Sequence, residues 1–151
     1  MLHAKSFPFA LRHRTGNTAE TARKVARFAV QPRLVGAFAQ AAYHGALEVV
    51  ARLAAAPSPD HRLALLTDMY IHWQHDVPYK IADAGAATGA EGEQLLNLVT
   101  RLCRQGLVLR HGAGAAREKL STETRIELAP ACRAELSGAF ARIHAGGDGP
   151  G

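Results

Sequence analysis

The segment from Arg101 to Pro130, RLCRQGLVLRHGAGAAREKLSTETRIELAP, restricts the fold more than any other part of the chain. It starts as the end of an amphipathic helix, which Gly106 is suited to cap. Two strand-like runs, Leu107–Arg110 and Thr124–Leu128, then flank a glycine-rich, charged tip and predict one β-hairpin. Because the middle of the hairpin has almost no large apolar residue, we expect it to stand outside the core.

Helices are predicted on both sides of this hairpin. The helix before it, from about Glu91 to Gln105, should bury the residues of its apolar stripe, Leu95, Leu98, Val99 and Leu102. A short helix from about Tyr79 to Ala87 and a turn at Thr88–Ala90 come earlier. The last helix opens at Pro130 and should bury Leu136, Phe140 and Ile143. The fold class is therefore mainly α with a small β-hairpin.

Two longer helices are predicted in the first half of the chain. One runs from Arg33 to about Ala56 and carries Gly45 and many alanines, so another helix can approach it closely. The next runs from about Pro59 to His75, with Ser58 as N-cap and Pro59 in the first turn. Its apolar stripe predicts that it buries Leu63, Leu66, Met69, Tyr70 and Trp73.

The predicted organisation has one core, which suits 151 residues with a hydrophobic fraction of 48%. A basic arm without periodicity covers residues 1–16, and N-terminal helices cover 17–58, with a capping box at Asn17 and Glu20 opening a short helix to about Phe28. Residues 59–129 form the unit that ends in the hairpin. The last helix covers 130–145, and residues 146–151 are expected to be a disordered tail.

Several protein classes are disfavoured by the sequence. It has no run of 18 apolar residues, so we expect no membrane span. Cys103 and Cys132 match neither zinc spacing nor a disulfide framework, which favours a reducing cytoplasm. A redox-sensing role remains an alternative to Cys103 being a small buried hydrophobe. We find no nucleophile elbow, phosphate loop, HExxH element or paired carboxylates, and therefore predict neither an enzyme nor a cofactor.

Positive charge is concentrated at the N-terminus. Residues 1–33 hold seven Lys and Arg, including Lys5, Arg12 and Arg14, against one acid, whereas the rest holds 11 basic and 12 acidic residues. A basic arm of this kind favours a polyanionic partner such as nucleic acid. An organelle transit peptide and a solvated tail are the alternatives.

The predicted order of helix, short helix, turn, helix and hairpin is that of a winged helix-turn-helix. An α-helix about 10–12 Å across fits the DNA major groove, which is about 12 Å wide. On the exposed face of the 91–105 helix, Gln94 and Asn97 are suited to base edges, and Arg101 or Arg104 to phosphates or guanine. The hairpin offers further basic side chains to phosphates, namely Arg110, His111, Arg117 and Lys119.

The sequence resembles the MarR family of bacterial transcription regulators in three motifs. KIADAGAATGA resembles the family's first motif helix and turn, LLNLVTRLCRQGLVLR its recognition helix and the start of the wing, and IELAPACRAEL the second strand and the entry to the last helix. The resemblance implies a homodimer whose terminal helices pair and whose two recognition helices read a palindrome in double-stranded DNA. Leu120 to Thr122 stand where the family usually has Asp-x-Arg, and there Arg117 or Lys119 would substitute.

Two further sites are candidates, each with a simpler alternative. Asp68, His72 and Asp76 recur every four residues beside His75, which is compatible with a transition metal, although a polar exposed helix face is the favoured interpretation. The resemblance bears on the metal alternative, because some MarR-like regulators sense zinc. A pocket for an aromatic effector would be lined by Tyr43, His44, Tyr70 and Trp73, which otherwise are core residues.

Two functions therefore remain. The first is a dimeric, sequence-specific DNA-binding regulator, which the motifs and the basic arm favour. The second is a winged-helix module for protein–protein contact, which the near-neutral charge of residues 34–151 and the acidic start of the 91–105 helix favour. We take the first as the prediction.

Overall fold

The computed structural model describes residues 36–111 and 119–146. In this part of the chain, five helices and two strands follow one another as α3 (Gly36–Ala55), α4 (His61–Gln74), α5 (Ile81–Thr88), α6 (Gly92–Arg104), β1 (Val108–Arg110), β2 (Ile126–Leu128) and α7 (Pro130–His144). The mainly helical fold with one antiparallel hairpin is confirmed. The arm, the helix expected to end near Phe28, and tail residues 147–151 lie outside the described residues.

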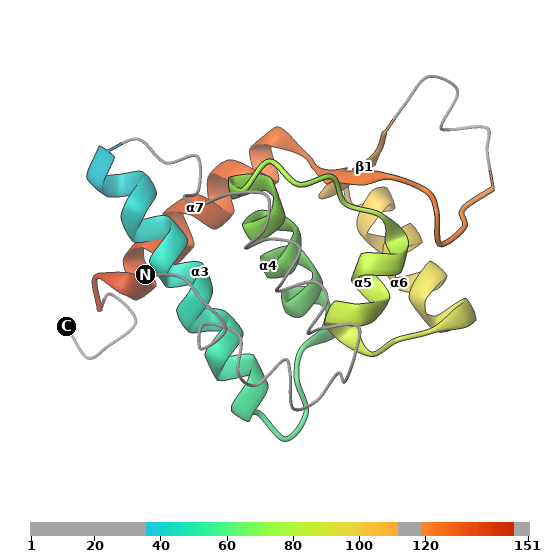
Figure 1. Ribbon diagram of the computed structural model, residues 1–151, viewed down its shortest axis with the longest axis horizontal. Coiled ribbons are helices and arrows are strands. Elements are labelled where there is room, and N and C mark those ends of the chain that lie inside the picture. Colours follow the sequence, from blue (N-terminus) through green and yellow to red (C-terminus); the bar gives the residue numbers. More distant parts are fainter. Residues whose placement is uncertain (1–35, 112–118, 147–151) are drawn as a thin grey trace.

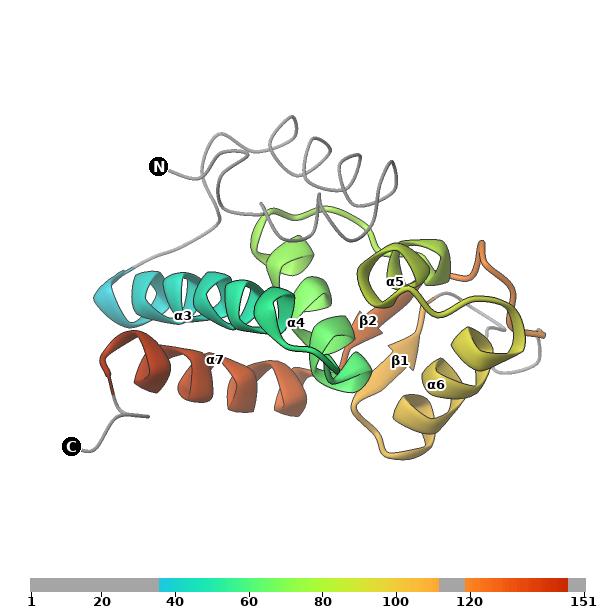
Figure 2. The ribbon, with the colours of Figure 1, turned by 90° about the horizontal axis from the view of Figure 1, so that it is seen from below.

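The helices divide into two groups along the molecule. In Figure 1, α3 crosses in front of α7, and Figure 2 shows these two helices in adjacent layers. The hairpin, α5 and α6 lie together at the other end, with α4 between the two groups. The core is continuous through both groups, because α4 packs against α3, α5, α7 and β2.

Gly45 allows the close crossing of α3 and α7. A Cβ atom at this position would lie 1.8 Å from the backbone oxygen of Phe140 and 2.5 Å from its carbonyl carbon. Only glycine therefore fits at this distance between the two backbones. The expectation that another helix approaches the glycine- and alanine-rich helix is confirmed, and the helix that does so is α7 of the same chain.

The start of α4 differs from the prediction. Asp60, not Ser58, is the N-cap, and Pro59 precedes the cap instead of occupying the first turn. The Asp60 carboxylate accepts a hydrogen bond from the Leu63 backbone N–H at 3.1 Å. A side-chain oxygen at this position satisfies one of the unpaired N–H groups of the first turn, and aspartate does this as well as serine.

The core includes two apolar residues of α4 that were not predicted, Leu65 and Ile71, and more of the hairpin than predicted. The expected residues Leu66, Met69 and Tyr70 are buried, whereas Leu63 and Trp73 are only partly buried. The expectation that the hairpin stands outside the core is wrong for its strands, because three alternate side chains point inward and are buried: Val108, Ile126 and Leu128. In α7, Phe140 is buried as predicted, while Leu136 and Ile143 are partly buried.

Candidate nucleic-acid interface

A tight turn joins α5 to α6. Gly89 ends α5 with a positive φ of 79°, a conformation that glycine adopts without steric cost, and its N–H bonds the Gly85 oxygen at 2.8 Å. The Thr88 hydroxyl accepts from the Ala90 N–H at 3.1 Å, which fixes the next residue of the turn. A Cβ at Gly85 would meet the Leu95 side chain at 3.2 Å, so the two helices pack closely.

The two faces of α6 differ completely in character. The inward face buries the four residues predicted for it: Leu95, Leu98, Val99 and Leu102. The outward face presents four exposed side chains that follow one helical stripe: Gln94, Asn97, Arg101 and Arg104. Within the described part of the chain, none of these four side chains has a hydrogen bond or ion pair. Their donors and acceptors are therefore available to a ligand.

The hairpin follows α6 after a sharp turn. Gln105 is the C-cap of α6, and Gly106, the residue predicted for that role, follows it with a positive φ of 75°. In the hairpin, Val108 pairs with Leu128 and Arg110 with Ile126. The hairpin is also joined to the start of α5, because Lys80 forms an isolated β-bridge with Arg125.

The chain between β1 and β2 returns along the first turn of α5. The Ile81 N–H donates to the Thr124 oxygen at 3.0 Å, and the Ala82 N–H to the Thr122 oxygen at 2.9 Å. Two N–H groups of the α5 N-terminus are thereby bonded to this return segment. The hairpin base is thus fixed relative to the α5–α6 pair. Such a fixed arrangement is needed if α6 and the hairpin are to bind one rigid ligand together.

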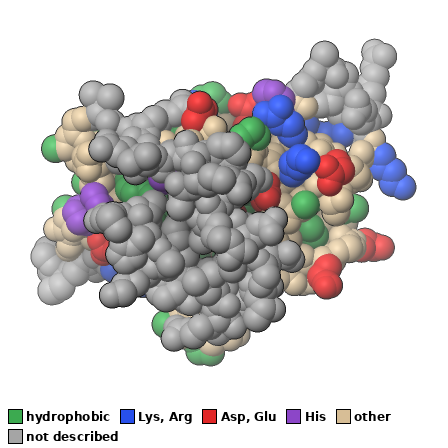
Figure 3. Space-filling model, in the orientation of Figure 1, with side chains coloured by type: hydrophobic (Ala, Val, Ile, Leu, Met, Phe, Trp, Pro, Cys, Tyr) green, Lys and Arg blue, Asp and Glu red, His purple; other side chains and the backbone are tan. Residues whose placement is uncertain are grey.

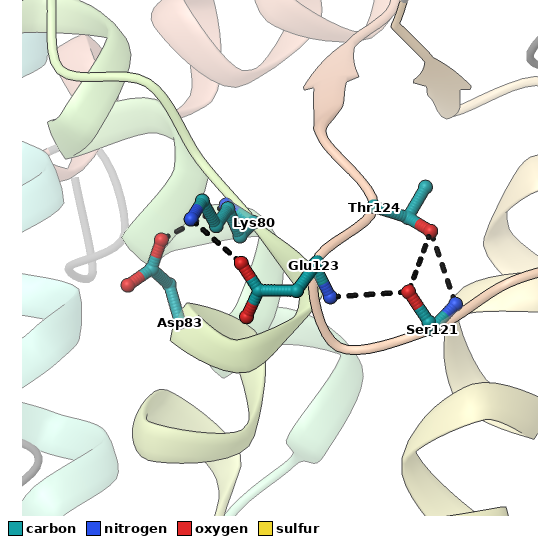
Figure 4. A network of polar contacts seen from close by, with 5 residues as sticks. All are labelled: Lys80, Asp83, Ser121, Glu123 and Thr124. Atoms are coloured by element: carbon teal, nitrogen blue, oxygen red, sulfur yellow. Dashed lines mark hydrogen bonds and ion pairs between the residues drawn. The ribbon is translucent and has the colours of Figure 1, made fainter.

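Side chains strengthen this junction, as Figure 4 shows. Lys80 Nζ donates to the Glu123 carboxylate at 2.8 Å, and this bond is the main reason that the pKa of Lys80 is raised. The Lys80 backbone N–H donates to Asp83 Oδ2 at 2.9 Å. On the other side of Glu123, Ser121 Oγ accepts from the Glu123 N–H at 3.2 Å. The exposed ion pair itself adds little stability, so its main effect is positional.

Charges of both signs surround the site. On the face seen in Figure 3, Lys and Arg side chains gather toward the end with α5 and the hairpin, and acidic side chains lie among them. The described residues hold ten Lys and Arg and ten Asp and Glu, so the net charge of +5 resides outside them. Glu91 and Glu93 lie at the start of α6, where a carboxylate interacts favourably with the positive end of the helix dipole. Glu91 is the N-cap residue of α6, but its side chain makes no cap hydrogen bond.

The predicted phosphate contacts are only partly placed. Lys119 is exposed beside the hairpin, and Arg110 at the end of β1 is partly buried. Arg12, Arg14 and Arg117 lie outside the described residues. Two exposed cations, Lys80 and Arg125, were not predicted for this site, because the β-bridge that joins them links positions far apart in the sequence.

Among the metal-site candidates, His72 and its neighbour His75 are buried and Asp68 is partly buried, so the expected exposed polar face is wrong for these residues. His72 is 1% exposed, its Nδ1 bonds the Asp68 backbone oxygen at 2.9 Å, and the Tyr79 hydroxyl donates to the Asp68 carboxylate at 2.6 Å. Asp76 is exposed beyond the end of α4. No group of three or more His, Cys, Asp or Glu that could hold a metal is found among residues 36–111 and 119–146.

The predicted effector-pocket residues make separate contacts within the described segments. These residues are Tyr43, His44, Tyr70 and Trp73. Tyr43 bonds His75 at 2.8 Å, and the next residue, His44, is exposed with its ring centroid 5.8 Å from that of Tyr43. Tyr70 is fully buried and bonds Ser137 at 2.7 Å, while the Arg133 guanidinium covers the Trp73 ring at 4.6 Å. Tyr43 and Tyr70 belong to the core and Trp73 packs against it, as the alternative interpretation expects, and the effector pocket stays a prediction.

The two cysteines are separate thiols. Cys132 is buried and Cys103 partly buried, and burial is the main cause that raises the pKa of both. A raised pKa lowers the thiolate fraction and hence the reactivity, which disfavours redox sensing.

Comparison of the chain with known protein families, with curated proteins and with solved structures gave no match. None of the helices in the described segments has the length and apolar character to cross a membrane.

Proposed function

We propose that the protein is a sequence-specific double-stranded DNA-binding protein of the winged helix-turn-helix type, with α6 as its recognition helix. The observation that carries the proposal is the outward stripe of α6, where four exposed side chains without partners in the described segments face solvent beside the hairpin. Glutamine and asparagine pair bidentately with adenine, and arginine with guanine or phosphate. Such a stripe on a helix is suited to major-groove contact.

The surroundings of α6 support the same function. The fixed junction between α5 and the hairpin would hold Lys119 and Arg125 beside the DNA major groove, where they would contact phosphates. The basic residues 1–33 would add further phosphate contacts. We further propose a homodimeric, MarR-like transcription regulator. The motif resemblance supports this assignment. The small-residue face of α3 at Gly45 is covered by α7 of the same chain and therefore does not serve as the dimer contact in this proposal.

The second candidate function is protein–protein contact through the same winged helix. The specific observation in its favour is the balance of ten cations and ten anions in the described residues, together with the exposed Glu91 and Glu93 at the start of α6. A surface of this kind suits a partner of mixed charge. The protein–protein contact function predicts no salt-sensitive binding to any DNA duplex.

The proposal is tested by removing one cation at a time from the α6 stripe. Arg101→Ala and Arg104→Ala should each weaken binding to a 30-base-pair duplex in fluorescence anisotropy. A cation that contacts phosphate should also make the slope of log K against log salt shallower by about 0.9.

Arg52→Ala is the matched control, because Arg52 is exposed on α3 and lies outside the α6 stripe. It should leave both the affinity and the salt slope unchanged. If all three variants bind as the parent protein does, α6 does not contact DNA.

A further inference from the structure

A groove of about 540 Å³ lies where the start of α4, the middle of α7 and Leu107 meet. Its apolar lining is aliphatic, with Leu66 from α4, Leu136 from α7 and Leu107 from the turn before β1. None of the described residues that line it is aromatic. The volume falls within the range of small-ligand sites, roughly 300–1,000 Å³.

Two arginine residues line this groove from different helices. Arg62 comes from the first turn of α4 and Arg142 from the last turn of α7. Both are exposed, and neither has a hydrogen bond or ion pair within residues 36–111 and 119–146. One acid, Glu135, also lines the groove, which leaves a net charge of one positive unit. That balance fits a monoanion.

Gly138 shapes the α7 wall of the groove. A glycine inside a helix costs about 1 kcal/mol relative to alanine. Packing does not require it here, because a Cβ atom would meet only the Arg142 guanidinium nitrogen, at the ordinary distance of 3.6 Å. This contrasts with Gly45, where a Cβ would collide with backbone. The absence of a side chain at Gly138 instead leaves space beside the Arg142 guanidinium.

We propose that this groove binds a small aliphatic monocarboxylate. The carboxylate would lie between Arg62 and Arg142, whose planar donor groups match carboxylate geometry. The hydrocarbon chain would lie against Leu66, Leu107 and Leu136, where its burial is favourable. The site shares no residue with the outward stripe of α6, so it does not depend on the proposed DNA binding.

The test is titration of the full chain with octanoate, followed by calorimetry and by ¹H–¹⁵N correlation spectra. Octanamide is the matched neutral probe. We expect saturable binding of one octanoate, with shift changes centred on the amides of Leu107, Cys132 and Leu136. Octanamide should bind at least about tenfold more weakly, because it lacks the charge that the two arginines recognise.

Variants then locate the site. Arg62→Gln and Arg142→Gln should each weaken octanoate binding about tenfold and leave octanamide binding unchanged, whereas Arg52→Gln on α3 should change neither. Gly138→Leu should fill the groove and abolish binding of both probes without lowering the melting temperature.

Three results would each overturn the proposal. These are equal affinity for octanoate and octanamide, octanoate affinity that is unaffected by both arginine changes, or full octanoate binding by the Gly138→Leu protein.

Discussion

The Gly45→Ala protein should be less stable than the parent by about 3 kcal/mol or more, in spite of the better helix propensity of alanine. The added Cβ would lie 1.8 Å from the Phe140 backbone oxygen, which cannot rotate away as a side chain can. The α3 and α7 helices must therefore separate along their crossing, and the core contacts around it are lost. Thermal unfolding followed by circular dichroism should show a melting temperature lower by roughly 6–12 °C.

The same substitution at Gly138 is the matched control, because Gly138 lies on α7, the other helix of the crossing, and a Cβ there would make only an ordinary 3.6 Å contact with the Arg142 side chain. Gly138→Ala should leave stability unchanged or raise it by up to about 1 kcal/mol. Equal stability of the Gly45→Ala and parent proteins would show that α3 and α7 do not cross this closely.

Stability should fall as the pH is lowered from about 6.5 to about 4, because His75 is buried as a neutral ring. It is 4% exposed, and the loss of solvation, together with the nearby His72, lowers the pKa of His75 to about 4. Its Nε2 bonds the Tyr43 hydroxyl at 2.8 Å, and burial raises the pKa of that tyrosine, so no anion forms there to offset a charged ring. The Nδ1 atom has no partner in the described part of the chain.

The direction of the effect follows from proton linkage. Between the folded pKa near 4 and the unfolded value near 6.5, the unfolded state binds a proton at His75 that the folded state does not. The contribution of neutral His75 to the free energy of unfolding is therefore fully present above pH 6.5 and is lost as the pH falls toward 4. A shift of this size corresponds to about 3 kcal/mol at most. Urea unfolding at a series of pH values measures it.

His75→Gln should remove most of this acid dependence, because an amide can bond Tyr43 and does not titrate in this range. His61→Gln, at the partly exposed start of the same helix, should leave the dependence in place. A His75→Gln protein that loses stability between pH 6.5 and 4 as the parent does would contradict this role of His75.

Local patterns were sufficient to predict the helix–turn–helix–hairpin order and the inward face of α6. The apolar positions of α6 all fall on one side of a helix whose other side is solvated, so their spacing alone identifies the buried stripe. Glycine preferences identified the turn at Gly89 and the end of α6 at Gly106 for the same local reason.

The errors came from contacts between distant segments. The side of α4 that carries His72 was assigned to solvent, but Tyr43 of α3 and Tyr79 before α5 cover it. One helix pattern cannot show which other elements pack on its second face. The bridge between Lys80 and Arg125 and the groove between Arg62 and Arg142 are likewise made by distant residues, and were not found from sequence.

Selection of bound duplexes from a library with a randomised central region tests the central claim most directly. The account predicts that one motif is enriched, and a dimer would make it a palindrome with half-sites about one helical turn apart. Gln94→Ala and Asn97→Ala should relax the preference at one or two positions of each half-site, by about 1–3 kcal/mol of discrimination each, while affinity for unselected duplex stays nearly the same. A folded protein that enriches no motif and shows no salt-sensitive affinity for any duplex would contradict the assignment of α6 as a DNA-recognition helix.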